Sequence, residues 1–224
     1  MILAAGLGQR MRPLTDHTPK PLLPVAGKPL IVYHIEKLRA LGVTELVINI
    51  AYLGHKIREY LDDGSLLGVS IHYSEELEPL ETAGAINQAL PKLGEEPFLL
   101  INGDVWSDYS LLSLSLQVLA PDCLGRLLLV PNPGYREAGD FTLREGLICQ
   151  REIGETGYTF SGISLIRPAL VADYPHCRER FALREVFDWA ISQGRLGGEL
   201  YDGRWWDVGT PERLAALDAQ LRIP

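Results

Sequence analysis

The chain has 224 residues, of which 46% are hydrophobic and 22% charged, and its net charge is −8. This length allows one large α/β domain or two small ones with a full core. The negative charge argues against general binding to nucleic acids or to anionic membranes. The odd number and the spacing of Cys123, Cys149 and Cys177 fit no metal site, so we expect reduced thiols in a cytoplasmic protein.

Strand and helix patterns alternate through the first half of the chain. Apolar and β-branched runs predict strands at 3–5, 43–50, 69–74, 97–104 and 126–134. Helical spacing with glycine or proline boundaries predicts helices at 29–41 and 53–64, and a third that starts at residue 82. This alternation with short loops indicates a Rossmann-like, mixed but mostly parallel sheet with helices on both faces.

The second half has a different pattern. Residues 140–167 form short alternating runs broken by glycines, which predicts hairpins added at one edge of the sheet. A helix is predicted over 181–194, and residues 196–209 are strand-like. Thr210, Pro211 and Glu212 have the residue types that cap and begin a last helix. We expect a single domain spanning residues 1–224.

The first predicted strand runs into a glycine turn that cationic side chains follow: Gly6, Gly8, Arg10, Arg12 and Lys20. Glycines at a strand end bring backbone N–H groups close to a ligand, and the cations indicate that this ligand is an anion. Residues 1–28 carry four cations against Asp16 alone, a charge of +3, which leaves −11 for the remainder. Met11 replaces the third glycine of a dinucleotide-binding turn, and no Gly-Lys-Ser/Thr follows as in a Walker loop.

Two aspartates, Asp104 and Asp207, follow predicted strands. Ligands in open α/β sheets bind at the carboxyl ends of the strands. Each aspartate alone could simply cap a turn. The pair could instead hold Mg²⁺, which takes one or two carboxylates and completes its shell with phosphates and water. Trp205 and Trp206 could stack on a base or sugar or pack in the core, and no histidine is assigned a catalytic role.

These motifs combine into a family resemblance. "LAAGLGQRMRPLT" followed by "PKPLLPVAGKPLI" resembles the signature of the sugar-1-phosphate nucleotidyltransferases, and it begins after only Met1 and Ile2, so the first strand is expected to be short. "PLETAGAI" resembles the base-side loop, and "NGDVW" and "WWDVGT" resemble the segments that carry the metal aspartates. The resemblance implies the nucleotide-diphospho-sugar transferase type of fold. The nucleotide-binding half would then span about 1–125 and the sugar-binding half about 126–224.

The resemblance also implies a reaction in which a nucleoside triphosphate and a sugar 1-phosphate give a nucleotide sugar and pyrophosphate, with Mg²⁺ as cofactor. Arg12 would stabilise the leaving pyrophosphate, Lys20 would lie by the attacked α-phosphate, and Asp104 and Asp207 would hold the metal. The sugar would lie near Gly139, Asp140 and Gly162. The residues implied to bind the nucleotide are Leu3, Ala4, Ala5, Gly6, Gly8, Arg10, Glu81, Thr82, Ala83, Gly84, Asn102 and Gly103.

Within the family, "TPKPL.PVAG.PLI.YH", "EPLET.G.I" and "GDVW.DY" resemble the compact bacterial N-acetylmuramate 1-phosphate uridylyltransferases, which implies UTP, a muramic acid sugar and cell-wall recycling. Mannose-1-phosphate guanylyltransferases are the nearest alternative. The family's Glu-Lys-Pro segment is absent, and Arg151 is a candidate to replace its lysine. Non-catalytic regulatory relatives typically lose an arginine, the lysine or an aspartate, and this chain keeps all of them. The sequence leaves the oligomeric state open.

Overall fold

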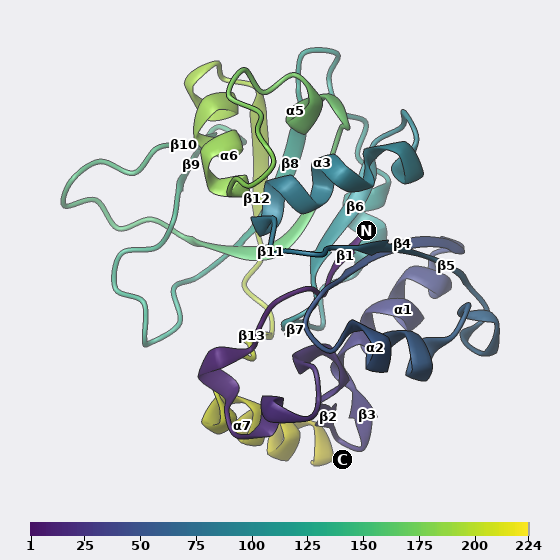
Figure 1. The fold of residues 1–224 in the computed structure, drawn as a ribbon. Coiled ribbons are helices and arrows are strands. Elements are labelled where there is room, and N and C mark those ends of the chain that lie inside the picture. The colour runs from purple at the N-terminus through teal and green to yellow at the C-terminus, as the bar shows by residue number, and fades with distance from the viewer. Residues whose placement is uncertain (224) are drawn as a thin grey trace. The chain divides into compact units, whose positions relative to one another are not determined.

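The computed structural model describes residues 1–223, which form two compact units (Figure 1). Unit 1 comprises Met1–Pro79, Ile101–Leu111 and the chain from Trp205 onward, and unit 2 comprises Leu80–Leu100 and Leu112–Arg204. The two units therefore interleave along the chain. No helix of residues 1–223 combines the length and the apolar character that crossing a membrane requires.

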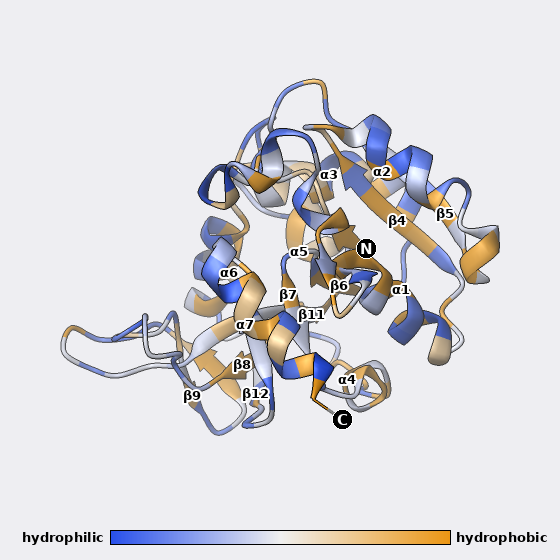
Figure 2. Ribbon diagram, turned by 90° about the horizontal axis from the view of Figure 1, so that it is seen from below, coloured by the Kyte–Doolittle hydropathy of each residue, from blue (hydrophilic) through white to orange (hydrophobic). Residues whose placement is uncertain are grey.

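The sheet strands of unit 1 are all parallel. Their order is β5 (Ser70–Glu75), β4 (Glu45–Ile50), β1 (Ile2–Leu3) and β6 (Phe98–Asn102), of which β6 contributes its last two residues. β1 is short as expected, and Ile2, opposite Ile48 and Ile101, is fully buried. β4 is among the most hydrophobic segments in Figure 2. Because neighbours flank β1 on both sides, two residues suffice to place the chain that follows it.

Smaller elements complete unit 1. They are the 3-10 helices Gln9–Met11, Leu14–Asp16, Lys20–Leu22 and Ser65–Leu67, the strands β2 (Pro24–Val25), β3 (Lys28–Pro29), β7 (Val105–Ser107) and β13 (Trp205–Asp207), and the helices α1 (Leu30–Ala40), α2 (Gly54–Leu61) and α7 (Pro211–Arg222). β7 and β13 pair antiparallel, as do β2 and β3. The expected cap of α7 is confirmed, because the Thr210 side chain accepts a hydrogen bond from the Arg213 N–H.

The strands of unit 2 are mixed in direction. Their order is β11 (Thr159–Ile166), β8 (Gly125–Val130), β12 (Leu196–Leu200), β10 (Leu147–Cys149) and β9 (Thr142–Arg144). Only β8 and β12 are parallel, and β9 and β10 form the added hairpin expected from the sequence. The helices are α3 (Glu81–Leu93), α4 (Leu111–Ser115), α5 (Ala169–Ala172) and α6 (Leu183–Ser192). The expected α/β class with a mixed, mostly parallel sheet is confirmed.

Several boundaries differ from the sequence prediction. The strand predicted to reach residue 134 ends at Val130, because Pro131 has no N–H for the ladder. The strand predicted to reach residue 104 ends at Asn102, where the chain turns toward β7. The 3-10 helices, β2, β3, β7, α4 and α5 were not predicted, since two to five residues show no hydrophobic period.

Gly84 offers a test of the packing of α3. A Cβ atom at residue 84 would lie 2.4 Å from the Glu179 carbonyl oxygen, a backbone atom that cannot move aside cheaply. The change Gly84→Ala should therefore lower the free energy of unfolding by about 1–3 kcal/mol, despite the better helix propensity of alanine. Urea denaturation would measure this. Gly134→Ala is the matched control, because no atom lies within 4 Å of its Cβ position, and equal stabilities of the two variants would contradict the prediction.

Candidate active site

The glycine turn after β1 leaves a run of backbone amides without partners. The N–H groups of Ala5, Gly6, Leu7 and Gly8 donate no hydrogen bond to any other part of residues 1–223. These residues are exposed or half-buried, so their amides are open to solvent or to a ligand. Successive free N–H groups in a turn make a concave site for an anion. The turn therefore has the property that binding of phosphates requires.

A buried polar network fixes the start of this turn. The Ala4 N–H donates to Asn49 Oδ1 at 2.8 Å, and Asn49 Nδ2 donates to Glu76 Oε1 at 2.6 Å. Asn49 and Glu76 are both buried: Asn49 lies near the end of β4, which pairs with β1, and Glu76 directly follows β5, which pairs with β4. The Ala4 amide is thus bonded within the protein, and the free amides begin only at residue 5. Sequence reasoning missed Asn49 and Glu76, although each stands where a predicted strand ends.

Side chains also hold the end of the turn and the segment after it, through backbone carbonyl oxygens. Thr15 Oγ1 donates to the Gly8 carbonyl at 2.8 Å, and Tyr52 Oη donates to the Thr15 carbonyl at 3.1 Å. Lys56 Nζ donates to the His17 carbonyl at 2.6 Å. Thr15 thus ties the last residue of the turn, and Tyr52 and Lys56 hold the segment that contains Thr15. Tyr52 and Lys56, which follow β4, therefore support the turn through the segment around Thr15.

Lys20 and Asp104 form the first ion pair of the site. Lys20 Nζ lies 2.7 Å from Asp104 Oδ2, and the lysine side chain is only 9% exposed whereas the aspartate is 38% exposed. Asp104 follows β6 through Gly103, whose N–H donates to the Leu3 carbonyl at 2.8 Å. A Cβ at residue 103 would lie 2.6 Å from that carbonyl oxygen, so the approach requires glycine. Asn102 is half-buried at the end of β6.

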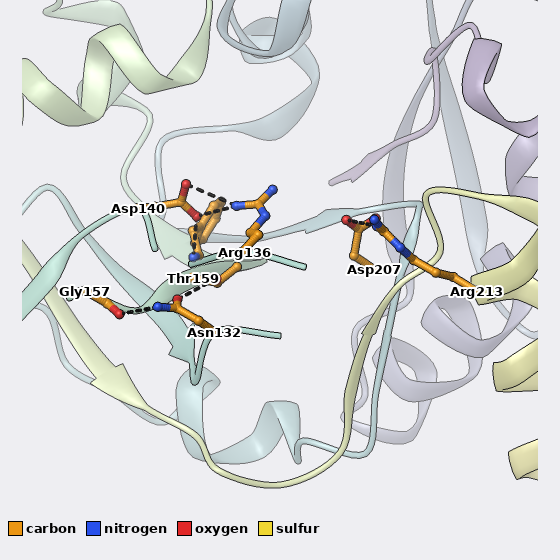
Figure 3. A network of polar contacts seen from close by, with 8 residues as sticks. Asn132, Arg136, Asp140, Gly157, Thr159, Asp207 and Arg213 are labelled. Atoms are coloured by element: carbon orange, nitrogen blue, oxygen red, sulfur yellow. Dashed lines mark hydrogen bonds and ion pairs between the residues drawn. The ribbon is translucent and has the colours of Figure 1, made fainter. Parts of the chain in front are cut away.

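Asp207 belongs to the same unit and carries its own cation. It lies opposite Val105 in the β7–β13 ladder, and the Val208 N–H donates to the Asp104 carbonyl at 2.9 Å. The backbones of Asp104 and Asp207 are therefore close together, offset by one residue across the two chain segments. Arg213 Nη1 lies 2.9 Å from Asp207 Oδ2 (Figure 3), and sequence reasoning missed this arginine because it lies inside a helix.

Arg10 and Arg12 lie in the segment after the free amides. Arg10 Nη2 comes within 3.3 Å of the Cβ position at Gly209, which places the guanidinium beside the turn that follows Asp207. Arg12 is 62% exposed and pairs with Asp16 at 3.3 Å. An ion pair in water is worth about 0–1 kcal/mol, so Arg12 can exchange Asp16 for a phosphate at little cost.

The carboxylates fit a magnesium ion shared with phosphates. Oxygen atoms of Asp104 and Asp207 are hard ligands, and Asp104 is open to solvent. Residues 1–223 contain no group of three or more Asp, Glu, His or Cys side chains that could hold a metal by themselves. Mg²⁺ is usually bound by one or two carboxylates with substrate phosphates, so two neighbouring aspartates are a suitable donor set.

In unit 2, the residues expected near the base begin α3. Glu81 pairs with Arg180 at 3.2 Å, and Thr82 Oγ1 accepts from the Leu183 N–H at 2.8 Å. The N–H groups of Ala83 and Gly84 both donate to the Phe181 carbonyl. These two amides are therefore already bonded, and the exposed groups of the set are the side chains of Glu81 and Thr82.

The residues expected near the sugar also lie in unit 2. Asp140 Oδ2 accepts from the Phe160 N–H and from Arg136 Nη1, each at 2.9 Å (Figure 3). Gly139 precedes it with φ +72°, and Gly162, with φ +81°, lies where the register of β11 shifts against β8. Asp140 is thus held rigidly between a strand amide and an arginine.

Neighbouring side chains in this region were missed by sequence reasoning. Asn132 Nδ2 donates to the Gly157 carbonyl at 2.8 Å and Asn132 Oδ1 accepts from Thr159 Oγ1 at 2.9 Å (Figure 3). The "NPG" turn of residues 132–134 was the available signal. Arg151 Nη1 donates to the carbonyls of Glu152 and Glu155 and so ties down its own loop.

The parallel strands of unit 1, the free amides after β1 and the two neighbouring aspartates are features typical of α/β proteins that bind nucleotides. A family model described as "Nucleotidyl transferase" matches residues 1–119. The chain belongs to this family, as its signature resemblance predicted.

Two similar proteins of known sequence extend over nearly the whole chain. An N-acetylmuramate alpha-1-phosphate uridylyltransferase from Neisseria meningitidis is 46% identical over 98% of this chain and 96% of its own length. A protein of the same name from Caulobacter vibrioides is 32% identical over 99% of this chain and 96% of its own length. Among solved structures, a putative glucose-1-phosphate thymidylyltransferase from Bacillus anthracis has a TM-score of 0.88 at 23% identity, over 100% of this chain and 94% of its own, which shows the shared fold.

The exposures of Lys20 and Asp104 predict that the two partners contribute unequally to stability. Asp104→Ala would leave a buried ammonium group without its counter-charge and should lower the free energy of unfolding by about 3 kcal/mol. Lys20→Met keeps the aliphatic stem and leaves a carboxylate that water reaches, so it should cost about 1 kcal/mol or less. Urea denaturation in metal-free buffer compares the two. The double variant should regain most of the loss, and a Lys20→Met loss as large as that of Asp104→Ala would refute the asymmetry.

Proposed function

We propose that the protein transfers the uridylyl group of UTP to N-acetylmuramic acid α-1-phosphate with the help of Mg²⁺, giving UDP-N-acetylmuramic acid and pyrophosphate. The observation that carries the nucleotide part is the run of free amides at residues 5–8 in the same unit as Lys20 and Asp104. The names of the two full-length relatives support the base and the sugar. A role in recycling cell-wall sugars in the cytoplasm follows from that substrate and belongs to the same proposal.

The chemistry needs positioning more than proton transfer. An anionic oxygen of the sugar phosphate attacks the α-phosphorus of UTP, the new P–O bond forms, and the bond from the α-phosphorus to the bridging oxygen breaks. The electron pair leaves with pyrophosphate. Because the attacking oxygen is already ionised at neutral pH, no general base is required. In-line placement and neutralisation of charge supply the catalysis.

The residues of each unit have their own roles in this scheme. The amides of residues 5–8 bind the phosphates, and Lys20 lies by the α-phosphate, where it offsets charge that develops in the transition state. Arg12 moves from Asp16 to the leaving pyrophosphate. Asp104 and Asp207 would hold Mg²⁺, which when bound would neutralise charge on the phosphate oxygens. Asp140 contacts the sugar, and Glu81 and Thr82 contact the base.

Pyrophosphate release tests the proposal. UTP, GTP, dTTP and CTP would each be incubated with Mg²⁺ and the 1-phosphates of N-acetylmuramic acid, N-acetylglucosamine, glucose and mannose. We expect turnover with UTP and the muramic sugar, and its loss in Asp104→Asn. A preference for GTP with mannose 1-phosphate would keep the reaction and overturn the substrate. Absence of pyrophosphate in every reaction of the folded protein would leave a binding protein without turnover.

Asp140 should act on the sugar phosphate and not on the nucleotide. Asp140→Ala removes the carboxylate that the proposal places against the sugar, and a hydrogen bond to a charged group is worth about 1.5–3 kcal/mol. The KM for the sugar phosphate should therefore rise roughly tenfold or more, with the KM for UTP unchanged. Steady-state kinetics of pyrophosphate release measures both constants. Asp173→Ala, an exposed aspartate of the same unit, is the control, and equal rises in both KM values for Asp140→Ala would argue against a sugar contact.

A further inference from the structure

Lys37 in α1 is not an ordinary surface lysine. Its side chain is half-buried, and Nζ donates to the carbonyl of Ser107 and, at 3.2 Å, to that of Tyr109. The ammonium also lies 6.0 Å from the centre of the Trp106 ring. Burial lowers the pKa of Lys37, and the nearby Asp108 raises it. A lysine that gives up hydration for two backbone carbonyls has a defined place in the structure.

His34 lies one helical turn before Lys37. Lys37 contacts Ser107 at the end of β7, and His34 contacts Val105 at its start. It is fully enclosed and shares a hydrogen bond with the backbone of Val105. Burial, reinforced by the charge of Lys37, lowers the pKa of His34 to about 4, so the imidazole is neutral at pH 7. Residues three apart lie on one face of a helix. One face of α1 therefore holds β7 at both of its ends.

β7 carries the backbone on which both carboxylates depend. Asp104 directly precedes its first residue, Val105, and Asp207 lies opposite Val105 in β13. The central residue, Trp106, packs in a core cluster that includes Met11 and Val208. Three-residue strands paired only with each other are marginal by themselves. The ladder therefore needs support from a neighbouring element, and Lys37 and His34 supply it.

We propose that Lys37 is a positioning residue for the Asp104–Asp207 carboxylate pair and acts on it through β7. The ammonium fixes the end of β7 with charge-assisted hydrogen bonds, and this fixes the spacing at which the two carboxylates meet a divalent cation. Groups that orient metal ligands typically change metal affinity 10- to 100-fold when removed. The inference rests on the proposed function, because that function gives the carboxylates their metal.

Metal binding without turnover tests the inference. Mn²⁺ in the presence of UTP, with no sugar phosphate added, reports on the site through the relaxation of water protons while no reaction can occur. Lys37→Met keeps the aliphatic stem and removes the ammonium. We expect about a tenfold weaker binding of Mn²⁺ than in the unchanged protein. The apparent Mg²⁺ requirement of pyrophosphate release should rise in parallel.

Three controls separate positioning from general loosening. Ile57→Val lowers stability from a fully buried position in α2 of the same unit and should leave Mn²⁺ affinity unchanged. Lys92→Met removes the charge of an exposed lysine and should also leave it unchanged. Asp104→Asn marks complete loss of the site. Unchanged Mn²⁺ affinity in folded Lys37→Met, or equal weakening in Ile57→Val, would overturn the inference. Equal binding by Asp104→Asn and the unchanged protein would instead refute the metal role of Asp104.

Discussion

The arrangement of unit 1 depends on leaving four successive amides unbonded. An unpaired N–H group is costly when buried, so a folded chain can keep such groups only where solvent or a ligand reaches them. The short strand β1 makes this possible, because it ends at Leu3 and releases the chain into an exposed turn. Asn49 takes the last amide that is buried, that of Ala4. The boundary between bonded and free amides thus coincides with the boundary between core and surface.

The charges of the site follow a second constraint, the cost of burial. A buried ion pair contributes little net stability, because desolvation opposes the attraction between its partners. Lys20 is nonetheless buried against Asp104, and Asp207 is held by Arg213. Each carboxylate thus has a cation of its own before any phosphate arrives. Such pairs keep two acidic groups at neighbouring positions of one ladder, where they would otherwise repel each other.

Local sequence patterns were sufficient to predict many of the element boundaries in this structure. Pro29 and Gly42 bracketed α1, Thr210 capped α7, and Asp104 could be placed after a strand because the apolar run before it is continuous. These features depend on neighbours within a few residues. The short strands β7 and β13 lack any such period, and their pairing joins residues about a hundred positions apart.

The partners that hold the site were harder to predict for the same reason. Asn49 and Glu76 stand at the ends of adjacent parallel strands, and only the register of those strands brings them together. Arg213 and Lys37 lie within helices, where a single cation looks like part of a solvated face. The amides of Ala83 and Gly84 donate to the Phe181 carbonyl, which lies about a hundred positions further along the chain, beyond the reach of any local pattern.

The cations differ in how firmly they are held, and this difference matches what each must do. Lys20 is enclosed and paired at 2.7 Å, which suits a charge that must stay fixed by the α-phosphate throughout the proposed reaction. Arg12 is exposed and paired through a surface contact, which suits a charge that must follow a leaving group and then release it. A firmly buried Arg12 would retain pyrophosphate, and a mobile Lys20 would have to be reordered in the transition state. The burial of one cation and the exposure of the other are therefore consistent with fixed binding on one side of the breaking bond and release on the other.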